Sequence, residues 1–177
     1  LTGRYASSPE TQMDKDLRAI STKGFLQFFK EAEEANLGET FWNVRLVQNL
    51  DTASINSPAF STYLAAQIFF NDRSLLSSST TVSHLINTGD VHHIFPKKYL
   101  QQNGLDERSL YNQVANYTYL DSTVNIAIGK KAPTEYFTEA LKQCKDGKAR
   151  VGLILNEDDF WANLKVNCVP KSVLNMK

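Results

Sequence analysis

The stretch GDVHHIFPKKYL, residues 89–100, holds two of the three histidines of this chain at adjacent positions. Asn-Thr-Gly-Asp turn chemistry precedes a short β-prone run that Pro96 ends, so the pattern predicts a brief strand. Adjacent side chains on a strand point to opposite faces unless the strand ends or twists there. We therefore expect His92 and His93 to have different tasks.

Several groups near this strand could carry chemistry. One imidazole could bind a metal ion through a neutral nitrogen while its neighbour, with an ordinary pKa of ~6.5, takes a proton from water. Asp90 lies two positions before His92, on the same strand face, where it could bind the metal directly or orient the imidazole. Asn125 offers a carbonyl oxygen of the kind that Mg²⁺ accepts.

The elements around the histidines can be predicted from turn and cap signals. Residues 114–120, VANYTYL, form a second β-prone run, and residues 121–131 read as a helix that Asp121 caps and that ends near Gly129. The order is strand, loop, strand and short helix. A further helix is expected from Pro133, and a last one over 156–176 with Asn156 as its cap.

The first part of the chain has a helical pattern. Helices are expected over 11–36, 39–50 and 58–70. Its aromatic residues are expected in the core or at contacts with another domain. The polar stretch 71–81 is the best candidate for a boundary or for the capped start of a short helix. We predict an α+β, mostly helical fold with a helical segment over 1–80, a central unit over 81–145 and a C-terminal helical segment over 146–177.

Composition limits the function classes. The chain has 177 residues, 42% of them hydrophobic, and 19 basic against 19 acidic residues, so no overall positive field draws it to nucleic acid. Any such contact needs a local patch, and the pairs Lys97–Lys98 and Lys130–Lys131 would suit phosphate groups. Two separated cysteines and no long apolar run point to a reducing cytoplasm and no membrane.

The segments DVHHIFP and NYTYLDSTVNIAIGKKAP together resemble the HNH nuclease motif, whose core is a ββα-metal unit. The resemblance implies that His92 binds the metal, that His93 is the general base and that Asn125 is the last metal ligand. Asn116 matches the central asparagine of the motif, where its amide would bond to the backbone and fix the path of the chain around His93. The order of these segments is also similar to the C-terminal part of the GmrSD/SspE-like modification-dependent restriction and anti-phage defence family.

The resemblance implies a metal-dependent endonuclease or nickase of a bacterial defence system, located in the cytoplasm. Its partners would be DNA, most simply phage double-stranded DNA, and an N-terminal nucleotide-hydrolysing, modification-sensing domain of the same longer protein. With asparagine as the last ligand, the site is expected to hold Mg²⁺ or Mn²⁺ rather than zinc or nickel. Two alternatives stay open: a non-catalytic DNA-binding or partner-docking domain, and an RNA-directed nuclease.

Overall fold

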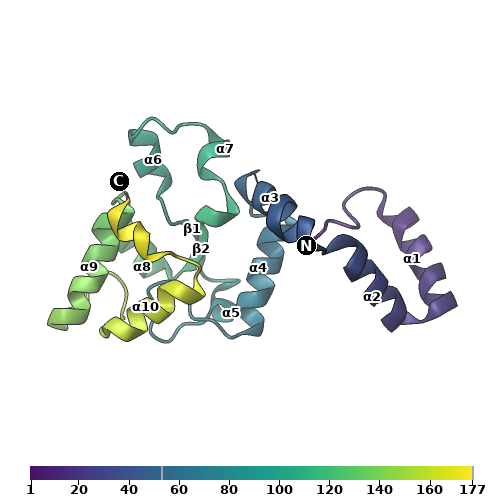
Figure 1. Cartoon of the computed structure of the whole chain (residues 1–177). Coiled ribbons are helices and arrows are strands. Elements are labelled where there is room, and N and C mark those ends of the chain that lie inside the picture. The colour runs from purple at the N-terminus through teal and green to yellow at the C-terminus, as the bar shows by residue number, and fades with distance from the viewer. Residues whose placement is uncertain (53, 177) are drawn as a thin grey trace.

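The structure, a computed structural model, describes residues 1–52 and 54–176. It is mostly helical with one small antiparallel sheet, as Figure 1 shows. The predicted α+β, mostly helical class is therefore confirmed. No helix among the described residues combines the length and the apolar character that crossing a bilayer requires.

The sheet lies at the centre of the larger part of the molecule. Strand β1 (Asp90–His93) pairs antiparallel with β2 (Tyr117–Leu120), and His93 lies opposite Tyr117. Helix α8 (Ser122–Ile128) follows β2 directly. Asp121 caps α8 by accepting a hydrogen bond of 2.9 Å from the Thr123 backbone N–H, and Gly129 ends it with a φ of 57°. The predicted order of strand, loop, strand and short helix is confirmed.

The connection between the two strands contains more structure than the predicted loop. Helices α6 (Lys97–Gln102) and α7 (Arg108–Tyr111) stand above the sheet in Figure 1, and a 3₁₀ turn (Val114–Asn116) leads into β2. We refer to residues 94–116 as the α6–α7 excursion. Both short helices were missed because one or two turns are too short to show an amphipathic period.

The two C-terminal helices pack against the main hydrophobic core. Helix α9 (Pro133–Asp146) begins at its proline, and α10 (Glu157–Val166) is capped by Asn156, both as predicted. The prediction of one helix over 156–176 is wrong. The chain turns after α10, where Cys168 has a φ of 57°, and continues as a short 3₁₀ helix (Lys171–Asn175).

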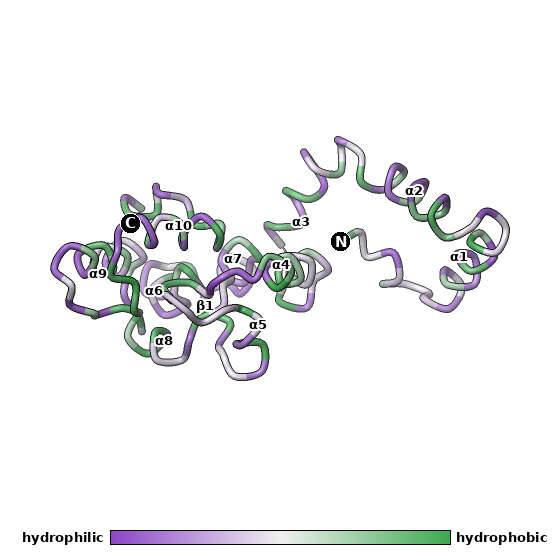
Figure 2. The backbone as a smooth tube through the Cα atoms, turned by 90° about the horizontal axis from the view of Figure 1, so that it is seen from below, coloured by the Kyte–Doolittle hydropathy of each residue, from purple (hydrophilic) through white to green (hydrophobic). Residues whose placement is uncertain are grey.

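The main hydrophobic core joins segments that are far apart in the sequence. Leu75 and Leu76 are fully buried with the strand β2, α9 and α10. Asn163 of α10 holds the same segment, because its Oδ1 accepts from the Leu76 N–H at 2.8 Å and its Nδ2 donates to the Ser74 carbonyl at 2.9 Å. The polar stretch 71–81 thus packs into the body, and the short helix α5 (Val82–Leu85) follows it. Figure 2 shows hydrophobic and hydrophilic stretches alternating along the tube in this region.

A second core lies between the sheet and the preceding helices. The π-helical turn (Phe41–Arg45), α3 (Leu46–Thr52) and α4 (Pro58–Phe69) approach the strands, and Phe60 of α4 contacts Tyr117 and Tyr119. Ser57 caps α4 through a hydrogen bond of 3.1 Å from the Phe60 N–H. This part of the helical segment packs on the central unit.

The first two helices form a hairpin that projects away from the body in Figure 1. The predicted single stretch over 11–36 is divided at Gly24, whose φ of 83° ends α1 (Pro9–Lys23) before α2 (Phe25–Asn36). Asp16 ties the chain start to α1 by accepting from Arg4 and Tyr5 at 2.5 to 2.9 Å.

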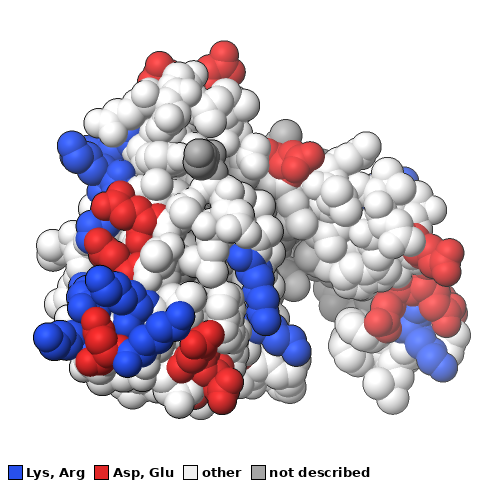
Figure 3. All heavy atoms as spheres, turned by 60° about the vertical axis from the view of Figure 1, so that its left-hand side comes forward, with Lys and Arg blue, Asp and Glu red and all other residues white. Residues whose placement is uncertain are grey.

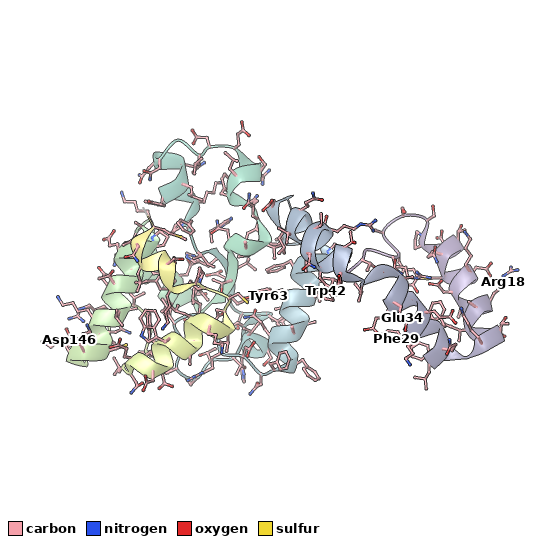
Figure 4. The ribbon with its side chains drawn as sticks, viewed as in Figure 1. Arg18, Phe29, Glu34, Trp42, Tyr63 and Asp146 are labelled. Carbon is pink, nitrogen blue, oxygen red and sulfur yellow. The ribbon has the colours of Figure 1, made fainter. Side chains whose placement is uncertain are left out.

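The aromatic residues of the first part lie mostly on the surface. Phe29 is 55% exposed on the hairpin and Trp42 is 48% exposed near its base, where Figure 4 labels both. Phe69 is 82% exposed at the end of α4. These three side chains are therefore not in the core, which was one of the two expected places, and their contact with another domain stays a prediction.

Candidate active site

An open groove of about 590 Å³ lies where β1, α6 and α8 meet. It collects most of the residues that the sequence marked for chemistry, although they come from three separate segments. Its polar and charged lining residues are His92, His93, Lys97, Lys98, Asn125 and Lys130. Both histidines reach this groove because His93 is the last residue of β1, so the strict alternation of faces ends there.

His92 forms the inner wall of the groove. It is 6% exposed, lies opposite Thr118 and has a buried Nε2 with no hydrogen-bond partner among the described residues. Burial lowers the pKa of His92 to about 4, although contact with Asn125 and the charge of Asp90 act in the opposite direction. The imidazole is therefore neutral at pH 7, which is the form that binds metal ions.

Asn125, which lines the groove, is joined by a hydrogen bond to Asp90, which is not one of the lining residues. The Nδ2 of Asn125, on α8, donates to Oδ2 of Asp90, on β1, at 3.1 Å. The amide nitrogen must face the carboxylate, which fixes the orientation of the side chain and leaves its carbonyl oxygen out of that hydrogen bond. The Asp90 carboxylate thus has its hydrogen bond to Asn125 and orients that amide, not an imidazole.

These side chains fit a divalent cation. The buried, unpartnered Nε2 of His92 is a polar atom whose isolation costs stability unless something occupies it. The neighbouring amide oxygen of Asn125 is a donor that suits hard ions such as Mg²⁺ or Mn²⁺. No group of three His, Cys, Asp or Glu side chains that could hold a metal ion occurs in the described part of the chain.

His93 is held firmly at the rim of the groove. Its Nε2 lies 3.0 Å from Oδ1 of Asn112, and its ring packs against Tyr117 and Tyr111 with centroid distances of 5.0 and 5.9 Å. Burial lowers the pKa of His93, the hydrogen bond to Asn112 opposes this, and the charge of Lys97 adds to the lowering. A lowered pKa leaves His93 neutral near pH 7, so one ring nitrogen can accept a proton.

Asn116 organises the chain around His93. Its Oδ1 accepts from the Phe95 N–H at 2.7 Å, and its Nδ2 donates to the carbonyls of Tyr111 at 3.0 Å and Phe95 at 3.3 Å. These are the backbone contacts that the sequence predicted for this residue. Asn116 closes the base of the α6–α7 excursion and does not line the groove.

The four predicted phosphate-binding lysines do not have equal positions. Lys97, Lys98 and Lys130 line the groove, and Nζ of Lys97 lies 5.3 Å from the centre of the Tyr111 ring. Lys131 instead forms an ion pair with Glu139 of α9, at 2.6 Å. On the face that Figure 3 displays, acidic side chains stand among the basic ones.

Sequence reasoning missed Asn112, the hydrogen-bond partner of His93. A signal was present, because Asn112 stands four residues before Asn116 in the segment YNQVANYTYL. The spacing alone does not predict the contact with His93, because that contact forms only when the 3₁₀ turn brings both amides back to the end of β1.

Comparisons with protein-family models, with curated proteins and with solved structures gave no match to this chain.

Proposed function

We propose that this chain is a metal-dependent nuclease that hydrolyses phosphodiester bonds in DNA, with His93 as the general base. The observation that carries the proposal is the groove itself. A neutral, half-buried His93, His92 with its buried and unpartnered Nε2, and three lysines line one space of about 590 Å³. Metal-assisted hydrolysis of a phosphodiester uses three kinds of group together: a base, a site for a cation and positive charge that compensates the phosphate.

The chemistry follows from the positions of the side chains. His93 accepts a proton from the water whose oxygen forms the new bond to phosphorus, while the bond from phosphorus to the 3′ oxygen breaks. Help from a positioned base contributes roughly 10²–10⁴ in rate. His92 and Asn125 would hold the divalent ion, with Asp90 orienting Asn125. A bound ion supplies positive charge that stabilises the phosphate and the leaving oxygen.

The lysines and Asn116 have supporting tasks in this scheme. Lys97, Lys98 and Lys130 neutralise phosphate oxygens at the groove, which favours binding of any nucleic-acid backbone. Asn116 holds the chain just after β1 against the end of the excursion, because its Oδ1 accepts from the Phe95 N–H. Lys131 contributes less to phosphate binding, because its ammonium group already forms an ion pair with Glu139.

The substrate and setting come from the resemblance to the GmrSD/SspE-like family. It favours double-stranded phage DNA, a cytoplasmic location in bacteria and a modification-sensing, nucleotide-hydrolysing domain in the same longer protein. One such centre cuts one strand at a time, so nicking is the elementary reaction.

The test is cleavage of supercoiled plasmid with Mg²⁺ or Mn²⁺, with and without EDTA. We expect metal-dependent nicking that His93→Ala abolishes and that His84→Ala, an exposed histidine of α5, leaves intact. A purified His93→Ala variant with full metal-dependent nicking would remove His93 as the base. Binding without any cleavage would instead identify a non-catalytic DNA-binding domain, and cleavage of RNA alone an RNA-directed nuclease.

A further inference from the structure

Asn112 makes a direct hydrogen bond to the proposed base. Its Oδ1 lies 3.0 Å from Nε2 of His93. A carbonyl oxygen only accepts hydrogen bonds, so the bond exists only when Nε2 carries the proton. In a neutral imidazole the other nitrogen, Nδ1, then holds the lone pair.

The second ring nitrogen is placed to use that lone pair. His93 lines the groove, and within the described residues its Nδ1 has no hydrogen-bond partner. Nδ1 is also not fully buried. In the described residues, the fully buried side-chain nitrogen and oxygen atoms without a partner belong to Gln67 and His92. Nδ1 is therefore accessible to a water molecule, whereas Nε2 is occupied by Asn112.

Asn112 is itself held from both sides. Its backbone N–H donates to the Arg108 carbonyl at 2.9 Å and ends α7. The carbonyl of the preceding Tyr111 accepts from Asn116 at 3.0 Å. The Tyr111 and Tyr117 rings then limit rotation of the imidazole, so the amide and the ring meet in a defined geometry.

We infer that Asn112 is a positioning residue that selects the Nε2–H tautomer of His93 and so presents Nδ1 to the attacking water. The inference rests on the proposed role of His93 as the base. It also gives Asn116 a second task, because the Asn116 amide holds the turn from which Asn112 reaches His93. The α6–α7 excursion thereby contributes to the chemistry as well as to phosphate contact.

The test compares three variants. Asn112→Asp keeps an acceptor of the same shape, Asn112→Leu removes it at similar size, and Gln113→Leu changes a neighbouring amide that does not contact His93. The tautomer is read from the nitrogen chemical shifts of ¹⁵N-labelled metal-free protein near pH 7.5. Plasmid nicking under single-turnover conditions gives the rate, and thermal unfolding reports the fold.

We expect the wild type, Asn112→Asp and Gln113→Leu to show His93 protonated at Nε2. Asn112→Leu should show a mixture of tautomers and a loss of about 10–100-fold in the nicking rate, as for other residues that orient a reacting group. A wild-type spectrum with the proton on Nδ1 would overturn the inference, as would an unchanged tautomer and rate in a folded Asn112→Leu. The spectra test the tautomer without any cleavage. A wild type without nuclease activity would therefore contradict the proposed function but not the hydrogen bond between Asn112 and His93.

Discussion

Acidifying the metal-free protein from about pH 7.5 to about pH 5 should destabilise it through His92. In the unfolded chain the His92 pKa is ~6.5, whereas burial lowers it to about 4 in the folded chain. Between these values the unfolded state binds a proton that the folded state does not. The stabilising contribution of neutral His92 is therefore complete above about pH 6.5 and decreases as the pH falls toward about 4.

The size of the effect follows from the two pKa values. Integrating the difference in bound protons from about pH 7.5 to about pH 5 gives a loss of about 2 kcal/mol in the free energy of unfolding. His93 adds a loss of the same sign, because burial lowers its pKa as well. Ordinary carboxyl groups titrate mostly below this range, so they contribute little.

Urea unfolding in EDTA at both pH values measures this directly. The contribution of His92 is the difference between the pH-dependent losses of the wild type and of His92→Gln, and we expect that difference to be about 2 kcal/mol. His84→Gln, on the exposed side of α5, is the matched control and should keep the wild-type loss. Equal losses in the wild type and His92→Gln would show that His92 is not a buried neutral group, and its Nε2 would no longer be a candidate metal ligand.

Three further results are expected. Asn116→Ala should lower the free energy of unfolding by about 2 kcal/mol, since three hydrogen bonds to the backbone are lost; a neutral effect in urea unfolding would contradict its organising role. Lys98→Ala and Lys130→Ala should each reduce the salt dependence of DNA binding by about one unit of slope, whereas Lys131→Ala should not, and filter-binding titrations over a salt series distinguish them. Mg²⁺ at a hundredfold excess over its Kd should stabilise the wild type by about 2.7 kcal/mol, and Asn125→Leu should lose this gain in thermal unfolding; equal gains in both would exclude Asn125 as a ligand.

Much of the scaffold could be predicted from the sequence because local signals agree with tertiary packing. Asp121 and Asn156 cap the helices that they were expected to cap, and Pro133 lies in the first turn of its helix. These positions depend on backbone hydrogen bonds within a few residues, which the order of residue types largely determines. The two strands followed from the same kind of local pattern.

The parts that were wrong or missed depend on contacts between distant segments. The pattern of Phe29 and Trp42 indicates an apolar face, but only the path of the chain shows that these side chains stay 55% and 48% exposed. The burial of Leu75 and Leu76 in a polar stretch depends on Asn163, almost ninety residues later. Asn112 likewise reaches His93 only after the excursion has folded back on itself.

The closed base of the α6–α7 excursion has a consequence for how such a protein can diversify. The backbone N–H groups of Ile94 and Phe95 both donate to Asn116. The two ends of the excursion are therefore hydrogen-bonded to each other next to the sheet. Changes in its length or composition need not shift the pairing of β1 with β2. The excursion can therefore change in length between α6 and α7 without moving His93, provided that Asn112 and Asn116 keep their contacts at its base.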